Sequence, residues 1–73
     1  MEIIEINTEF IKLDQFLKFS GIVGSGSEAK MLIKEGLVRV NGEICTMRGK
    51  KIRPSDTVEI EDEMIFKVVN EEE

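Results

Sequence analysis

The spacing of apolar residues predicts a short strand and then a helix in the first part of the chain. Residues 2–6 form a short segment rich in isoleucine, which is typical of a strand. Further along, Leu13, Phe16 and Leu17 recur at i, i+3 and i+4, the spacing of one face of a helix. Because glycine accepts the left-handed conformation that ends many helices, we expect this helix to end at Gly21.

A second helix is predicted to begin after Ser25. Ser25 and Glu28 form the S-x-x-E pattern of a capping box, in which the serine hydroxyl accepts a hydrogen bond from a helix amide that otherwise has no partner. Leu32 and Ile33 then belong to the apolar face of this helix, and Gly36 provides a suitable end. The two predicted helices are therefore separated by a short loop that contains glycine.

After the second helix, apolar residues recur at every second position, which indicates the strands of a hairpin. Val38 and Val40 alternate with a polar position, and Asn41-Gly42 is a strong signal for a tight turn. A two-residue turn would place Val40 opposite Glu43, whereas a three-residue loop with a left-handed glycine would place it opposite Ile44. Because two apolar side chains pair better than a valine and a glutamate, we expect the three-residue loop.

The rest of the chain predicts three further strands. The second strand of the hairpin is expected to continue through residues 44–47, and a basic connection over residues 48–56 ends in turn-forming residues. Strands are then predicted at residues 58–60 and 64–69, where apolar residues alternate. Residues 70–73, which end in three glutamates, are expected to form an acidic frayed tail.

Composition narrows the function classes. The chain has 73 residues, 41% of them hydrophobic and 34% charged, so we expect a single domain over residues 1–73 with one small core. The sequence has no histidine and one cysteine, Cys45, which excludes an imidazole base, a histidine-containing zinc site and an internal disulfide. We expect neither an active site nor a cofactor nor a metal. Cys45 is expected to be a small buried side chain on a strand.

Charge is distributed in three blocks, although the net charge is −5. Residues 12–53 carry nine of the ten bases and four of the fifteen acids, whereas residues 1–11 and 54–73 are acidic. A basic centre between acidic ends is compatible with a nucleic-acid partner despite the net charge. The acidic N-terminal region and the lack of an apolar run of about 20 residues predict a cytoplasmic protein without a targeting peptide or membrane span.

Several residues of this basic centre match a known family. The string Lys12-Leu13-Asp14-Gln15-Phe16-Leu17-Lys18, then Ala29, Leu32-Ile33, Gly36, Val38 and Val40-Asn41-Gly42, resembles the spine of the S4 RNA-binding domain, named from ribosomal protein S4 of the small subunit. The resemblance spans residues 11–60, and the additional N-terminal strand is similar to the stand-alone bacterial branch of YaaA/YbcJ-like proteins. It implies an α+β fold in which two antiparallel helices pack on a small, mostly antiparallel sheet and face structured RNA.

Cationic side chains supply most of the candidate RNA-binding residues. The helices carry Lys12, Lys18, Lys30 and Lys34, and the sheet side carries Arg39, Arg48, Lys50, Lys51 and Arg53, all able to neutralise phosphates. Ser25 and Ser27 lie where free amides at a helix start attract phosphate. The resemblance adds Asp14, Gln15 and Asn41, the last being first of all a turn residue. Gly26 stands where many family members carry arginine, so residues 48–53 are expected to contribute more of the binding.

The sequence also predicts how RNA is recognised. It has no tryptophan or tyrosine, and Phe16 and Phe66 are predicted core residues, so stacking on single-stranded bases is not expected. We expect a non-catalytic monomer that recognises folded or double-helical RNA by shape and phosphate position. The resemblance implies ribosomal RNA and a role in ribosome assembly or maturation. Two alternatives are a protein-interaction adaptor that uses the acidic ends, and a fragment of an enzyme such as a pseudouridine synthase or a tyrosyl-tRNA synthetase, where similar domains occur.

Overall fold

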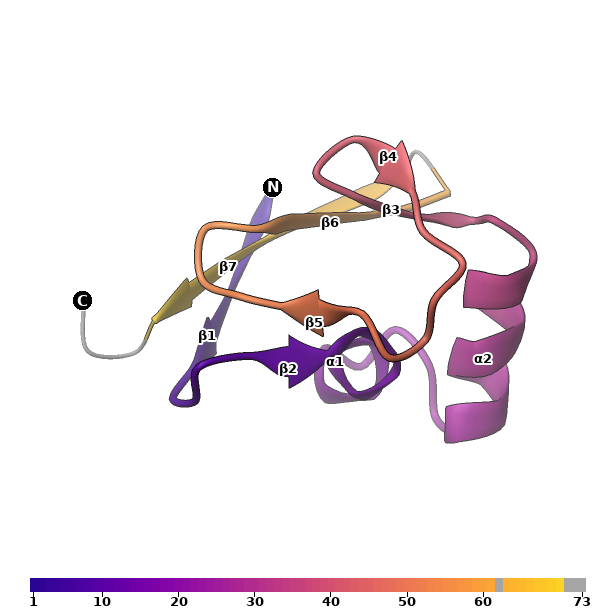
Figure 1. The fold of residues 1–73 in the computed structure, drawn as a ribbon, viewed down its shortest axis with the longest axis horizontal. Coiled ribbons are helices and arrows are strands. Elements are labelled where there is room, and N and C mark those ends of the chain that lie inside the picture. Colours follow the sequence, from indigo (N-terminus) through magenta and orange to yellow (C-terminus); the bar gives the residue numbers. More distant parts are fainter. Residues whose placement is uncertain (62, 71–73) are drawn as a thin grey trace.

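A computed structural model describes residues 1–61 and 63–70 and shows two layers (Figure 1). The first layer is a five-stranded sheet in the order β1 (Glu2–Ile6), β7 (Met64–Asn70), β6 (Thr57–Ile60), β3 (Val38–Val40) and β4 (Glu43–Ile44). The second layer consists of α1 (Leu13–Phe19), α2 (Gly26–Lys34) and a two-stranded sheet of β2 (Ile11–Lys12) and β5 (Lys51–Ile52). The predicted α+β class is confirmed, and so are both helices and the first strand.

The large sheet is antiparallel except at one edge. The N-terminal strand β1 runs parallel to β7, with Ile4 paired to Val68, whereas β7, β6, β3 and β4 pair antiparallel in that order. Alternation along β6 places Val58 and Ile60 in the core and Glu59 on the opposite face. The sheet therefore has one apolar face, and the second layer covers it.

The core lies between the two layers. Leu13, Phe16 and Leu17 of α1 are fully buried, as the predicted helix spacing requires. The rings of Phe16 and Phe66 meet edge to face, with 5.9 Å between their centroids and 82° between their planes, and join α1 to β7. Both phenylalanines are core residues, which confirms the prediction.

The helix ends follow the sequence signals. The Ser25 hydroxyl accepts a hydrogen bond from the Glu28 amide at 3.3 Å, as predicted for the cap of α2. Gly21 and Gly36 have φ angles of 83° and 76°, the left-handed conformation expected after each helix.

The two helices differ in orientation from the antiparallel pair that the resemblance implied. Figure 1 shows α1 end-on while α2 lies in the plane of the picture, so the helices cross. The loop between them buries Val23 and bonds its amide to the Leu17 carbonyl, which directs α2 across α1. Both helices contribute buried residues to the same core.

The prediction of a three-residue hairpin loop was wrong. Val40 pairs with Glu43 and Arg39 with Ile44, so the turn has two residues, Asn41 and Gly42, with φ angles of 52° and 86°. Positive φ at both central residues defines a turn whose twist matches that of paired strands. Glu43 stays exposed on the short edge strand β4, so its pairing with a valine buries no charge.

The segment after the hairpin also differs from the prediction. Strand β4 ends at Ile44 instead of continuing to residue 47, and the basic connection contains the strand β5, which was not predicted. Cys45 is half-buried in the loop after β4, with its thiol 3.7 Å from the Met47 carbonyl, and does not lie on a strand.

The C-terminal strand is longer than predicted. Asn70 belongs to β7 and pairs with Ile6, so it is not part of a frayed tail, and the remainder of that predicted tail, residues 71–73, lies outside the described residues. No helix in the described part of the chain is long and apolar enough to cross a membrane.

Candidate nucleic-acid interface

Five exposed cations are brought together around the small sheet. In the antiparallel β2–β5 pair, Lys12 lies directly opposite Lys51, and Ile11 lies opposite the buried Ile52. Lys50 immediately precedes β5 and Arg53 follows it, so both lie beside this pair. We call Lys12, Arg48, Lys50, Lys51 and Arg53 the β2–β5 basic cluster.

Backbone hydrogen bonds attach the remaining member, Arg48, to the start of α1. The Asp14 amide donates to the Arg48 carbonyl at 3.1 Å, and the Leu13 amide donates to the Lys50 carbonyl at 2.8 Å. The first amides of a helix have no partner within the helix, so these two carbonyls cap α1 in place of the Lys12 side chain, which makes no capping bond. The cap holds the connection between β4 and β5 against the helix start.

The aromatic ring of Phe10 lies against two of the cations. The Lys51 ammonium lies 4.9 Å from the centre of the Phe10 ring, and the Arg53 guanidinium carbon lies 5.8 Å from it. Both distances are within the range of a cation–π interaction. Phe10 therefore contacts two members of the cluster, although the sequence did not indicate it as a site residue. The available signal was an aromatic residue directly before the Ile11-Lys12 strand.

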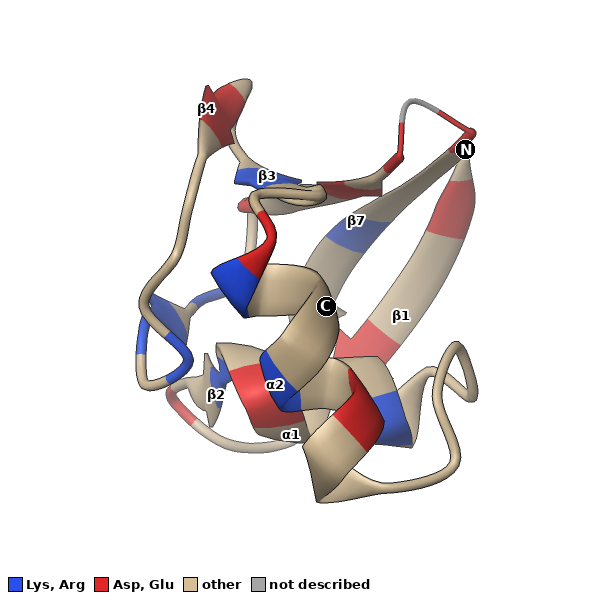
Figure 2. Ribbon diagram, turned by 90° about the vertical axis from the view of Figure 1, so that its right-hand side faces the viewer, with Lys and Arg blue, Asp and Glu red and all other residues tan. Residues whose placement is uncertain are grey.

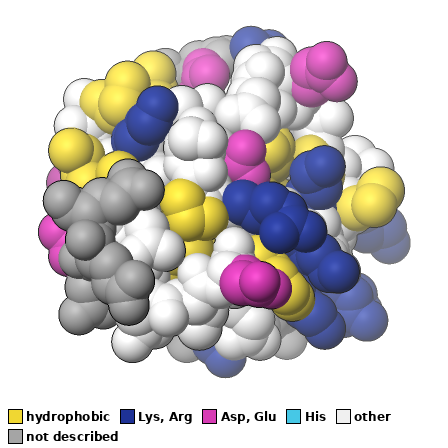
Figure 3. Space-filling model, turned by 60° about the vertical axis from the view of Figure 1, so that its left-hand side comes forward, with side chains coloured by type: hydrophobic (Ala, Val, Ile, Leu, Met, Phe, Trp, Pro, Cys, Tyr) yellow, Lys and Arg dark blue, Asp and Glu magenta, His cyan; other side chains and the backbone are white. Residues whose placement is uncertain are grey.

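The cluster is not neutralised within the described part of the chain. Its five side chains are exposed, and none of them forms an ion pair with residues 1–61 or 63–70. Figure 3 shows Lys and Arg side chains gathered in a band on one face of the molecule. Placing like charges close together is unfavourable, so this arrangement favours an external anion.

The predicted helix cations lie outside the cluster but are accessible. Lys18 is in the last turn of α1, and Lys30 and Lys34 are on α2; all three are exposed. Figure 2 shows blue segments on both helices and on the connection before β5; both helices also carry red segments, as does β1. The helices can therefore extend a basic surface that begins at the cluster.

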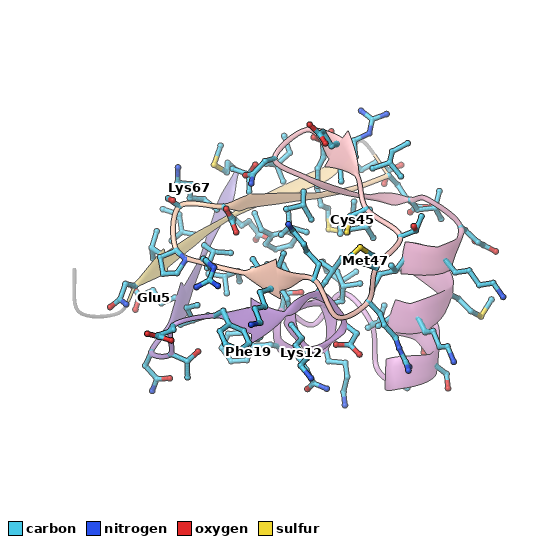
Figure 4. All side chains as sticks on the ribbon, in the orientation of Figure 1. Glu5, Lys12, Phe19, Cys45, Met47 and Lys67 are labelled. Atoms are coloured by element: carbon cyan, nitrogen blue, oxygen red, sulfur yellow. The ribbon has the colours of Figure 1, made fainter. Side chains whose placement is uncertain are left out.

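Arg39 does not join the cluster. Its neighbours Val38 and Val40 are buried in the core, so the Arg39 side chain points to the opposite face of the large sheet, where it lies across from Glu59. Lys67, which was not a candidate, is also remote: Figure 4 shows it at the upper left, far from Lys12 at the bottom.

Asn41 has a structural role. Its side-chain oxygen accepts a hydrogen bond from the Thr57 amide at 2.9 Å, and its side-chain nitrogen donates to Asp56 at 3.1 Å. The other oxygen of the Asp56 carboxylate accepts a bond from the Arg53 amide at 2.8 Å. This network ties the hairpin turn to the connection before β6, and both ends of the Asn41 amide are used in it.

The remaining candidate RNA-binding residues lie near the first turns of the two helices. Asp14 accepts a hydrogen bond from the Gln15 amide at 2.8 Å, and Gln15, three positions after Lys12, is exposed. Ser27 is exposed on the first turn of α2. The Ser25 hydroxyl and the Glu28 amide are bonded to each other, so this amide is not available to a phosphate.

A small α+β domain with one concentrated cationic surface is suited to bind a polyanion. Comparison with known proteins defines the family: the S4 domain matches residues 4–69, and the chain belongs to this family. It is similar to the "Probable ribosome maturation protein RlbA" of Bacillus subtilis (strain 168), with 46% identity over 67 residues that cover 92% of this chain and 94% of the relative.

Two solved structures share the fold. A pseudouridylate synthase matches with a TM-score of 0.66 and 29% identity over 71% of this chain, and the 30S ribosomal protein S4e from Thermoplasma acidophilum matches with a TM-score of 0.58 and 22% identity over 77%. This chain spans only 22% and 30% of their lengths, respectively. In both, the shared part is one portion of a longer protein.

Proposed function

We propose that this protein is a non-catalytic RNA-binding protein that recognises structured RNA through the β2–β5 basic cluster. The observation that carries the proposal is the placement of Lys12 opposite Lys51 in a cluster that the described residues do not neutralise. A phosphate backbone would stabilise these repelling charges and release its counterions on binding. Lys18, Lys30 and Lys34 extend the contact along the helices.

Recognition by shape is supported by three of the four phenylalanines, whereas the fourth, Phe19, is 61% exposed. Phe16 and Phe66 are buried against each other, and the Phe10 ring lies beside two cations. Double-helical RNA presents phosphates and 2′-hydroxyls at fixed spacing and is read mainly by shape. A cluster fixed by backbone bonds to α1 is suited to such a rigid target.

The biological role is proposed from the relative. The similar protein of Bacillus subtilis carries the name of a probable ribosome maturation protein. We extend this role to the present chain: a cytoplasmic monomer that binds ribosomal RNA or an assembly intermediate. The family does not favour the alternative of an adaptor that uses the acidic ends, and the sequence has no histidine and no cysteine pair, which excludes active sites built on either.

The test is binding to extracted ribosomal RNA across a salt series. The cluster variant carries Lys12→Gln, Arg48→Gln and Lys50→Gln, which leave Lys51 and Arg53 on Phe10. A matched helix variant carries Lys18→Gln, Lys30→Gln and Lys34→Gln, which change the net charge equally. We expect the cluster variant to reduce the log–log salt slope by roughly 2 to 3, because each lost phosphate contact removes about 0.7 to 0.9.

Three results would overturn the proposal. These are weak binding by the unmodified protein, a cluster variant that binds like the unmodified protein while remaining folded, and single-stranded homopolymers that bind as tightly as ribosomal RNA. If the helix variant alone loses binding, RNA recognition stands but the cluster is not its main surface.

A further inference from the structure

A second surface of the molecule is an apolar groove beside α2. The groove has a volume of about 360 Å³ and lies between α2 and the adjoining ends of β6 and β7. Val23 and Ile60, both buried, form its floor. Met31 of α2 and Met64 of β7 line its walls and remain 61% and 41% exposed. Exposed flexible methionines are common at surfaces that bind protein segments.

The rim of the groove is acidic. Glu28 of α2 and Glu35, the C-cap residue that follows α2, line it on one side and Glu61 on the other, and among the described residues its lining includes no lysine or arginine. All three glutamates are exposed. An apolar groove with three carboxylates at its edge complements a ligand that combines apolar and cationic groups, and it repels phosphate.

Helix α2 separates this groove from the cationic surface. Residues 28, 31, 32 and the C-cap residue 35 have the i, i+3, i+4, i+7 spacing of one helix face. Lys30 and Lys34 lie on another flank, and Ala29 and Ile33 face the core. A single helix thus presents an acidic, methionine-containing face and a lysine face in different directions.

We propose that this groove binds a peptide segment of a partner protein that carries apolar side chains next to lysine or arginine. The groove volume is at the lower end of typical ligand pockets, so it accommodates a few apolar side chains from a short segment. The rim carboxylates then pair with the neighbouring cations. The proposal uses a different face from the RNA contact, so a bound segment and a bound RNA do not compete for the same residues.

The experiment uses the full chain, isotope-labelled, and two synthetic peptides. The peptides share the same apolar residues at the same spacing and differ in carrying either lysine or glutamate at the polar positions. We expect the lysine peptide to cause saturable amide shifts that concentrate at Met31, Glu61 and Met64. The glutamate peptide is expected to cause none.

Variants separate this groove from general charge attraction. Met31→Ser is expected to weaken binding of the lysine peptide by about fivefold or more, as for an anchor residue, whereas Met47→Ser, at another exposed methionine, leaves it unchanged. Glu28→Gln with Glu35→Gln is expected to weaken binding. Glu2→Gln with Glu5→Gln changes the net charge equally on β1 and is expected to leave it unchanged.

Several outcomes would overturn the inference. Absence of shifts with either peptide, equal binding of both peptides, or equal loss in the variants and their controls would each do so. Shifts at Met31 and Met64 that depend on protein concentration without peptide would assign the groove to a second copy of this chain. Shifts at Met31 and Met64 caused by lipid vesicles in place of the peptide would assign it to a membrane surface.

Discussion

Lys12 and Lys51 face each other directly across the two-residue antiparallel pair of β2 and β5. Lys12 is also the N-cap of α1, where the positive end of the helix dipole disfavours a cation, and its side chain makes no capping hydrogen bond. Two unfavourable terms therefore meet at one exposed residue of a small domain. A bound anion would offset both unfavourable terms, which accounts for a lysine at this position.

Replacing Lys12 by threonine is expected to stabilise the fold and weaken RNA binding together. The free energy of unfolding should rise by about 0.5 kcal/mol, because the like-charge pair and the dipole conflict are removed. The salt slope of RNA binding should fall by roughly 0.7 to 0.9, the value of one lost phosphate contact. Denaturant titration and binding to ribosomal RNA measure the two effects. In the control, Lys67→Thr, RNA binding should not change; a Lys12→Thr protein that binds RNA normally would contradict the assignment.

The Phe10 ring is expected to act through the two cations beside it. Phe10→Leu keeps an apolar side chain but removes the ring, and should cost about 1 kcal/mol of stability, since exposed cation–π pairs contribute roughly 0.5 to 1 kcal/mol each. RNA affinity should fall several-fold because Lys51 and Arg53 lose their orientation. Phe10→Tyr retains the ring face and should behave like the unmodified protein. Equal affinities of the leucine and tyrosine variants would exclude this positioning role.

Asn41 is expected to matter for stability more than for RNA. Asn41→Gly keeps the positive φ of the turn and loses the side-chain bonds to Asp56 and Thr57, so it should cost about 1 kcal/mol. Asn41→Ala adds the strain of a left-handed residue and should cost about 1 to 2 kcal/mol more. Thermal and denaturant unfolding give these values. The RNA affinity of the folded glycine variant should stay within twofold of that of the unmodified protein. A larger loss would show that the Asn41 side chain contacts RNA.

The pair of Phe16 and Phe66 should dominate the stability of the core. Phe16→Ala is expected to cost about 3 to 5 kcal/mol, a large part of the stability of a domain this small. A double-mutant cycle with Phe16→Leu and Phe66→Leu should give a coupling energy of about 0.5 to 1.5 kcal/mol, the range for an edge-to-face pair. A coupling energy near zero would show that burial alone, without ring geometry, accounts for both residues.

The sequence alone determined the parts of the fold that depend on neighbours along the chain. The spacing of Leu13, Phe16 and Leu17, the Ser25 cap and the glycines after each helix act within a few residues, so their pattern is readable without the fold. The alternation along β6 and β7 was readable for the same reason. The basic content of residues 48–53 was also visible, and it identified most members of the cluster.

Tertiary structure decided what these elements form together. Ile11 pairs with Ile52 and Lys12 with Lys51 because the chain closes on itself around the core, and no local pattern specifies that pairing. The same closure places Phe10 beside Lys51 and uses the Asn41 amide for Asp56 and Thr57. Charge is encoded in the sequence, but the distance between charges far apart in the chain is set by the packing of the layers between them.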